Sequence, residues 1–250
     1  MADLIEHLES FLGPIAGGSR GDDATPEGVQ VAWFGPDVPF GGVTTLVTIG
    51  LSRRHLGLPN GEALHQELVM HVPTDDYPAR AAGLMFQVAG EMVRRRAGLQ
   101  QGQVIGPRGH LFPGGHTTAM VATSPRYLPE SFAVCHTESV AVVLAWLIPI
   151  TTGEAEVIQV LGWEALEQAF AAQNPDLADP ARTEVTLDQA STGGPRASGE
   201  PTAYHTDSTL RSVAHRPAQG LEGSSGRSAP ALGSRGFDGC AATPVAPGPE

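Results

Sequence analysis

The sequence has no lysine, only two cysteines and no long apolar run. All 15 basic residues of the 250-residue chain are arginines. Cys135 and Cys240 lie far apart, which argues against a disulfide framework and against a zinc site built from paired cysteines. The longest apolar stretch, residues 139–149, ends at a proline and is shorter than the roughly 20 residues that a membrane-spanning helix needs. These absences argue against a disulfide-stapled secreted fold, a zinc ribbon and a membrane-spanning protein.

Acidic residues give the chain a formal net charge of -12. The excess lies in residues 1–190, which hold 22 acidic residues and 10 arginines, whereas residues 191–250 hold 5 of each. An acidic domain repels phosphate groups, which argues against nucleic acid as the main partner. The N-terminal segment is acidic and amphipathic, whereas a secretory signal begins basic and continues apolar. We therefore expect a cytoplasmic protein with neither a nucleic acid nor a membrane as partner.

Composition divides the chain into two parts. Residues 191–250 contain 25 glycine, proline or serine residues among 60, and only 6 leucine, isoleucine, valine or phenylalanine residues. Such a segment buries too little apolar surface to offset the entropy lost on folding. We predict one domain over residues 1–190, large enough to bury roughly 70% of its unfolded surface, and a low-complexity, disordered tail over residues 191–250. A non-homologous extension is an alternative origin for this tail.

Hydrophobic periodicity and turn residues predict helices and strands along residues 1–190. Residues 141–150 are apolar on both faces, so this strand should lie in the centre of a sheet. Trp146 in this strand and Trp163 in the last helix are expected to be core residues. The predicted helices cover 4–12, 78–97 and 153–173, the last interrupted at Gly162; the predicted strands cover 29–34, 43–51, 65–72, 104–105, 118–123 and 141–150; residues 16–28 are predicted to form a loop.

Two short motifs resemble nucleophilic sites but lack the required context. Gly17-Gly-Ser-Arg-Gly21 matches the G-x-S-x-G string of a nucleophile elbow, which needs a strand before the serine and a helix after it. Here a helix is predicted before the motif and a polar loop after it. Cys135 and His136 are adjacent, and adjacent residues of an extended chain point to opposite faces. Neither motif therefore predicts a catalytic residue.

Four histidines form two pairs with the same spacing. His65 and His71 lie six residues apart, which on one strand separates them by about 20 Å, too far for a shared metal ion. His110 and His116 flank a short loop, but no third ligand accompanies them, and zinc needs three or four. The sequence also has no phosphate-binding glycine loop and no dinucleotide fingerprint. We expect neither a metal nor another cofactor.

Several segments, taken in order, resemble the suppressor-of-fused family. They are Val47-Thr-Ile-Gly-Leu-Ser52, Glu67-Leu-Val-Met-His-Val-Pro73, Val140-Ala-Val-Val-Leu-Ala-Trp-Leu-Ile-Pro-Ile-Thr-Thr152 followed by Glu154, Gly162-Trp-Glu-Ala-Leu-Glu167 and Asp176-Leu-Ala-Asp-Pro-Ala-Arg182. Each segment is short, and their order and spacing carry the resemblance. The motif positions that we interpret as structural are Gly50, Leu51, Glu67, Trp146, Pro149, Trp163 and Pro180.

The resemblance implies an α/β (α+β) domain with a mixed central β-sheet flanked by helices. It also implies binding of another protein rather than catalysis. In the animal family the domain holds a transcription factor of the Hedgehog pathway by clamping a short extended peptide. Bacterial members are regarded as including immunity proteins that neutralise secreted toxins.

Three functional hypotheses follow from these observations. The first is a non-catalytic protein-binding domain, specifically a bacterial immunity protein for a cognate toxin domain. The second is an intracellular scaffold or regulator that binds an extended endogenous peptide by strand addition. The third is an enzyme whose site is not recognisable from its motifs.

The loop after the Gly-Leu-Ser turn is the predicted partner-binding site. Its residues Ser52, Arg53, Arg54 and His55 follow a strong strand, and loops on rigid scaffolds commonly carry recognition. Arginine is enriched at binding hot spots and can grip a carboxylate with two hydrogen bonds. In the animal family, acidic and tyrosine residues follow this turn and touch the peptide. Those contacts do not carry over to this chain, so we expect a different partner.

Overall fold

The computed structural model describes residues 3–74 and 78–186 of the chain. The tail predicted for residues 191–250 and the domain boundary predicted at residue 190 lie outside the described residues. Among the described helices, none is both long and apolar enough to cross a bilayer.

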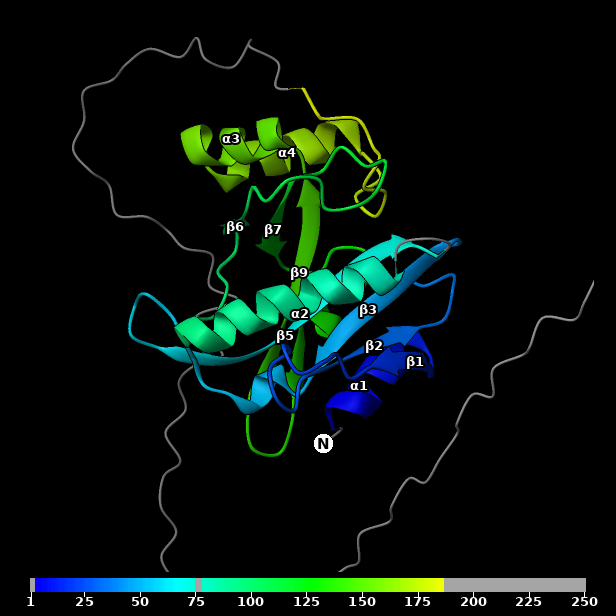
Figure 1. The fold of residues 1–250 in the computed structure, drawn as a ribbon, viewed down its shortest axis with the longest axis vertical. Helices are drawn as coiled ribbons and strands as arrows, with labels where there is room; N and C mark the ends of the chain where they lie inside the picture. Colours follow the sequence, from blue (N-terminus) through cyan, green and yellow to red (C-terminus); the bar gives the residue numbers. More distant parts are fainter. Residues whose placement is uncertain (1–2, 75–77, 187–250) are drawn as a thin grey trace, which may run out of the picture. The chain divides into compact units, whose positions relative to one another are not determined.

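Nine strands form one mixed sheet in the order β1-β2-β3-β5-β9-β7-β6, with β4 paired to β5 and β8 paired to β9 (Figure 1). Strands β5 and β9 run parallel, and the other pairs in the described part of the chain are antiparallel. The strands are β1 (Ile15–Ser19), β2 (Gln30–Phe34), β3 (Val43–Ile49), β4 (Leu56–Gly57), β5 (Ala63–Pro73), β6 (Val104–Ile105), β7 (Ala119–Thr123), β8 (Val134–His136) and β9 (Ala141–Ile150).

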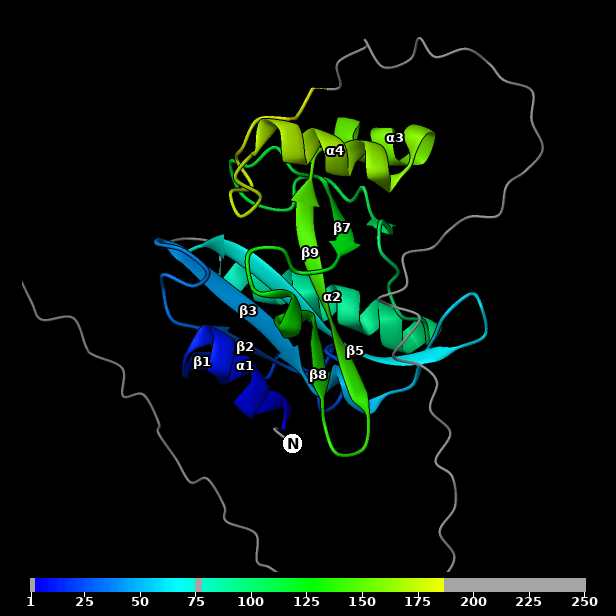
Figure 2. The ribbon, with the colours of Figure 1, turned by 180° about the vertical axis from the view of Figure 1, so that it is seen from behind.

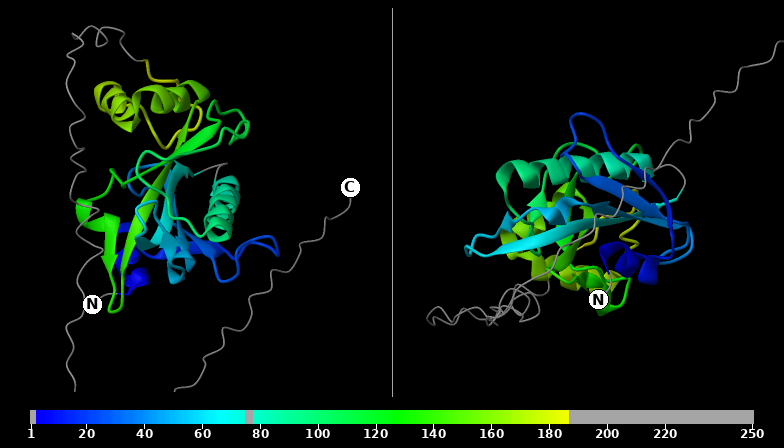
Figure 3. Two further views of the ribbon diagram at one scale, coloured as in Figure 1. Left: turned by 90° about the vertical axis from the view of Figure 1, so that its left-hand side faces the viewer. Right: turned by 90° about the horizontal axis from the view of Figure 1, so that it is seen from below.

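Four α-helices flank this sheet, which confirms the predicted fold class. The long helix α2 lies on one face, and α1, α3 and α4 lie on the opposite face (Figure 3, right). From behind, α1 lies beside β1 and β2, whereas α3 and α4 lie beyond the end of β9 (Figure 2). The helices are α1 (Leu4–Leu12), α2 (Pro78–Arg95), α3 (Thr152–Leu161) and α4 (Trp163–Gln173), and two short 3-10 helices are η1 (Leu51–Arg53) and η2 (Glu130–Ala133).

Strand β9 is buried on both faces, as its unbroken apolar sequence predicts. Ala145 and Leu147 belong to the apolar cluster that α2 covers. Trp146 and Ile148 alternate with them and belong to the cluster under α3 and α4. The period-2 alternation of a strand therefore divides the side chains of β9 between the two faces of the sheet.

Several predicted boundaries were wrong, and the short strands β4 and β8 were not predicted. Residues 15–19 form the edge strand β1 rather than the start of a loop, and their two glycines hid the strand pattern. A Cβ on Gly17 would lie 2.5 Å from the indole nitrogen of Trp33, so the missing side chain lets β1 pack against β2. The strand predicted over residues 43–51 ends at Ile49, because Gly50 turns the chain with φ 100°. Helix α2 ends at Arg95, two residues earlier than predicted. The predicted break at Gly162 is confirmed, with φ 89°.

A buried ion pair ties the last described segment to α3. Arg182 Nη1 and Nη2 donate to the two carboxylate oxygens of Glu154 at 2.6 and 2.7 Å, and both side chains are almost fully buried. The same carboxylate accepts the backbone N–H groups of Thr151 and Val185. The guanidinium of Arg182 also lies 5.2 Å from the centre of the Phe170 ring. A chain segment without regular secondary structure is thereby fixed against α3 and α4.

Candidate partner-binding site

The turn that follows β3 requires glycine at its first position. Gly50 has φ 100°, in the left-handed region that residues with a side chain rarely adopt. A Cβ at this position would lie 2.2 Å from the carbonyl oxygen of Gly28. The close approach of these two backbones turns the chain sharply into η1, where Leu51 is buried and anchors the start of the loop.

The carboxylate of Glu67 on β5 holds this turn from inside. Its Oε1 accepts the N–H groups of Gly50 at 2.8 Å and Ser52 at 2.9 Å. Its Oε2 accepts the hydroxyl of Thr48 at 2.7 Å and the N–H of Leu51 at 3.3 Å. Four donors from five consecutive residues therefore converge on one fully buried side chain. The loop leaves the sheet in a fixed conformation, which favours binding because less ordering is needed when a partner arrives.

Burial raises the pKa of Glu67 above its ordinary value. The hydrogen bonds from Thr48, Ser52 and Gly50 act in the opposite direction, because they stabilise the charged form. The loss of hydration outweighs them at this position. The result is a carboxyl group whose proton affinity depends on the geometry of the turn that it holds.

The predicted site residues lie on this held loop with different exposures. The carbonyl oxygen of Ser52 accepts a hydrogen bond from His65 Nδ1 at 2.5 Å, and Arg54 Nη2 donates to the carbonyl oxygen of Glu27 at 2.8 Å. His55 is exposed, with its ring centre 4.6 Å from that of His65. Arg53 is exposed, and its guanidinium makes no ion pair with any described residue. Arg53 and His55 are therefore the positions that face solvent.

A second arginine cluster, at the end of α2, lies beside the continuation of this loop. The N–H of Gly57 donates to the carbonyl oxygen of Arg96, and the N–H of Gly98 donates to that of Gly57, both at 2.9 Å. Residues 94–96 are exposed arginines. The sequence pattern places these three arginines in the last turn of a helix and predicts only that they are solvated there. The main-chain bridge between β4 and the end of α2 could not be inferred from spacing, because it joins residues about 40 positions apart.

The motif residues interpreted as structural lie in three places. Gly50, Leu51 and Glu67 build the turn under the loop. Trp146 and Pro149 lie on β9, where Trp146 is fully buried. Trp163 begins α4 and is 7% exposed, and the carbonyl oxygen of Pro180 accepts the N–H of His116 at 3.0 Å. Trp146 and Trp163 belong to the apolar cluster under α3 and α4.

The motifs set aside from the sequence do not assemble in the described chain. On β8, Cys135 is buried and His136 exposed, as expected for neighbours on a strand. Burial also raises the pKa of the Cys135 thiol, which disfavours the thiolate. Ser19 ends β1, and a loop rather than a helix follows it. Within residues 3–74 and 78–186, no three histidine, cysteine, aspartate or glutamate side chains gather as a metal site.

Comparison with known proteins decides the family. The family model described as suppressor of fused protein (SUFU) matches residues 25–183, more than half of the chain. The chain belongs to the SUFU family. The matched residues include the Glu67-held turn and Arg182, so the resemblance found in the short sequence segments is confirmed. No curated protein matches the chain in sequence.

Solved SUFU structures share the fold. A SUFU homologue from Neisseria gonorrhoeae FA 1090 matches with a TM-score of 0.58 and 18% identity, covering 73% of this chain and 94% of that one. The Sufu–Fu complex matches with a TM-score of 0.56 and 14% identity, covering 73% of this chain and 90% of that one. Drosophila Suppressor of Fused matches with a TM-score of 0.51 and 14% identity, covering 66% of this chain but only 44% of that one. The chain therefore spans less than half of the Drosophila protein.

Glu67→Gln is expected to loosen the loop and to lower the free energy of unfolding by about 2–3 kcal/mol. The glutamine NH2 group cannot accept, so the two donors that bind one carboxylate oxygen would lose a buried acceptor. Amide hydrogen exchange should accelerate at Gly50, Leu51 and Ser52. Glu138→Gln, at an exposed carboxylate, is the control and should change neither quantity. Unchanged exchange at the three amides in Glu67→Gln would show that the carboxylate does not hold the turn.

Proposed function

We propose that this SUFU-family chain is a non-catalytic protein-binding domain whose primary contact surface is the loop 52–55. The observation that carries the proposal is the buried Glu67 carboxylate, which fixes a loop that presents Arg53 and His55 to solvent. A member of the same fold is solved as a complex with another protein, Fu, which supports a protein partner. The nucleophile-like residues Ser19 and Cys135 have no hydrogen-bonded base in the described chain, which supports a role without catalysis.

The partner that we favour is a toxin domain, with the chain acting as a bacterial immunity protein in the cytoplasm. The net charge of -12 would speed the approach of a basic protein, because opposite charges steer association. Toxins that cleave nucleic acid are commonly basic. The loop would then give specificity, since Arg53 can grip a single carboxylate on an otherwise basic partner.

A scaffold or regulator that binds an extended peptide by strand addition is the second candidate. The observation that favours it is the edge strand β1, which among the described strands pairs with β2 alone. Three of its five residues are exposed, including Ile15. An added strand could pair with the free edge of β1 and place an apolar side chain against Ile15. None of the loop arginines belongs to β1, so variants of the two surfaces test the two candidates separately.

The double variant Arg53→Ala with Arg54→Ala is expected to weaken partner binding about tenfold or more while leaving the fold intact. The partner is first isolated from the native host with the full chain as bait, identified by mass spectrometry, and then titrated by calorimetry. Arg20→Ala, at an exposed arginine in another loop, is the control and should bind normally.

A loss below about 0.5 kcal/mol in the double variant would remove the loop as the site. If Ile15→Asp on β1 abolished binding instead, the peptide-binding candidate would replace it, since Ile15 is an exposed apolar side chain of the edge strand. Identification of a basic secreted toxin domain as the partner would support the immunity role, and an endogenous peptide would contradict it.

A further inference from the structure

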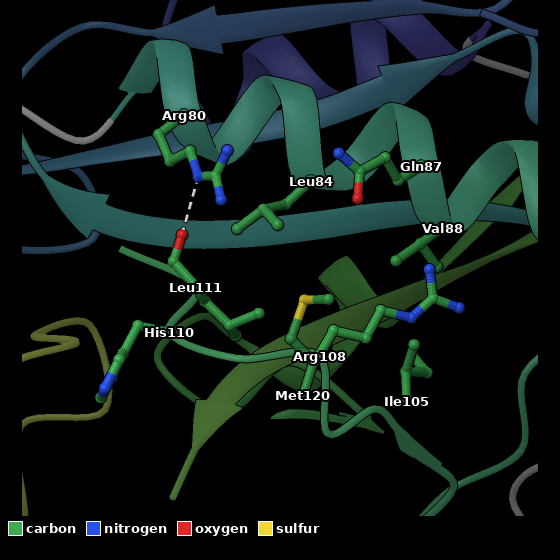
Figure 4. A pocket seen from close by; sticks show the side chains of 9 residues that line it. All are labelled: Arg80, Leu84, Gln87, Val88, Ile105, Arg108, His110, Leu111 and Met120. Carbon is green, nitrogen blue, oxygen red and sulfur yellow. Dashed lines mark hydrogen bonds between the residues drawn. The ribbon is translucent and has the colours of Figure 1, made fainter. Parts of the chain in front are cut away.

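A pocket of about 50 Å³ lies between α2 and the chain around β6 and β7 (Figure 4). Its floor is apolar and includes the buried side chains of Leu84, Val88, Leu111 and Met120. Arg80 and Arg108 also line it, and none of the residues of the loop 52–55 takes part. Ligand sites commonly combine a mostly apolar lining with a few placed polar or charged groups, and this small pocket has that composition.

The two arginines stand at different ends of the pocket. Arg80 lies on α2 one turn before Leu84, and its Nε donates to the carbonyl oxygen of Leu111 at 2.8 Å. Arg108 comes from the loop after β6 and contacts Glu91, eleven residues further along α2. At 1.5 Å per residue these two points on the helix are about 16 Å apart. The floor residues Leu84 and Val88 lie between them (Figure 4).

Counted over the described residues, both ends carry more positive than negative charge. Glu91 is shared by Arg94, Arg95 and Arg108, so a single carboxylate meets three guanidinium groups. The hydrogen bond from Arg108 and the neighbouring charges lower the pKa of Glu91, which keeps it ionised and still leaves an excess of positive charge. At the other end, the terminal nitrogens of Arg80 have no partner among the described residues. This cationic pocket stands out on a chain with a net charge of -12.

We propose that this pocket binds an extended acidic segment of a partner protein, with one aliphatic side chain in the floor and a carboxylate at each end. In an extended chain, residues i, i+2 and i+4 share a face, and the outer two are about 13 Å apart. The central side chain would lie over Leu84 and Val88, and the long glutamate and arginine side chains would make up the difference between this spacing and the roughly 16 Å that separates the two ends. The pocket is smaller than the roughly 150 Å³ cavity that holds a benzene ring, so the proposed occupant is a single small aliphatic side chain.

To test this, the full chain is titrated with the peptide acetyl-Glu-Ser-Leu-Ser-Glu-amide, and binding is measured from changes in the chemical shifts of the protein's backbone amides. The expected shifts are confined to residues 80–91 and 105–120. Arg80→Gln and Arg108→Gln should each weaken binding about fivefold or more, because each removes one charge-assisted contact. Gln87→Glu, which adds a negative charge at the pocket, should also weaken it. Arg20→Gln is the matched control and should bind the peptide normally.

Two further peptides separate charge from shape. Replacement of both glutamates by lysines should abolish binding, and replacement of the leucine by glycine should weaken it about fivefold or more. Equal binding of the lysine peptide, or shifts outside these residues, would overturn the proposal. The absence of any chemical-shift change on addition of the peptide would also overturn the proposal. Changes at the same amides that grow with protein concentration alone would overturn it too, since they would indicate that a second copy of this chain occupies the pocket. Because loop 52–55 is not part of the pocket, failure of either site leaves the other untouched.

Discussion

Arg182→Ala is expected to lower the free energy of unfolding by about 3–5 kcal/mol, among the largest effects of any single change in this chain. The side chain of Glu154 is 1% exposed, and its carboxylate would lose two hydrogen bonds and its counter-charge while remaining buried. The N–H groups of Thr151 and Val185 would remain as its partners, which is too little to compensate for the lost hydration of a charge. Urea unfolding followed by tryptophan fluorescence measures the loss.

Arg126→Ala supplies the control, because Arg126 also pairs with a carboxylate, that of Glu167, but is 35% exposed. Its loss should be below about 1 kcal/mol, as for other exposed pairs. The double variant Arg182→Met with Glu154→Leu should recover part of the loss of Arg182→Ala, since it leaves no buried charge. A loss below about 1 kcal/mol in Arg182→Ala would mean that water reaches Glu154 and that the pair is not a buried one.

The stability of the domain is expected to fall by up to about 1.4 kcal/mol per pH unit on acidification because of His71 alone. His71 is fully buried, and burial lowers its pKa from 6.5 to about 3. Thr45 Oγ1 donates its proton to the carbonyl oxygen of Val38, so it accepts from His71 Nδ1–H at 2.8 Å. The other ring nitrogen, Nε2, therefore carries the lone pair and faces the interior, beside the ring of Trp146.

The direction of the pH effect follows from the lowered pKa. Well above pH 6.5 the ring is neutral in both the folded and unfolded states, and the stability is fully present. As the pH falls from 6.5 toward 3, the imidazole becomes protonated in the unfolded state but stays neutral in the folded state, so the free energy of unfolding decreases. Urea midpoints measured across this range should depend less on pH in His71→Gln than in the unmodified chain. His136→Gln, at an exposed histidine on β8, should keep the original dependence, and equal dependence in all three proteins would contradict the assignment.

The candidate site was only partly visible in the sequence. The Gly-Leu-Ser turn and the arginines after it are contiguous, so a local pattern could mark the loop. Glu67 stood out through the family resemblance, but its four hydrogen bonds to residues 48–52 join two strands and depend on the register between β3 and β5. The pocket beside Arg80 had no sequence signal, because its floor and its two arginines come from α2 and from the chain around β6 and β7.

The sequence by itself determined the elements whose pattern is local. Helix α2, the interrupted pair α3 and α4, and the central strand β9 follow from periodicity, from Gly162 and from an unbroken apolar run, because each signal lies within one turn or one strand. Only the tertiary structure decided which strands are neighbours, that β1 is a strand at all, and that Glu154 meets Arg182 across 28 residues of chain. These features depend on which buried hydrogen-bond donors and acceptors are paired by long-range contacts when the chain folds. No local sequence pattern predicts these pairings, because the free energy of a buried polar group depends on partners that are distant in the sequence and adjacent only in the folded chain.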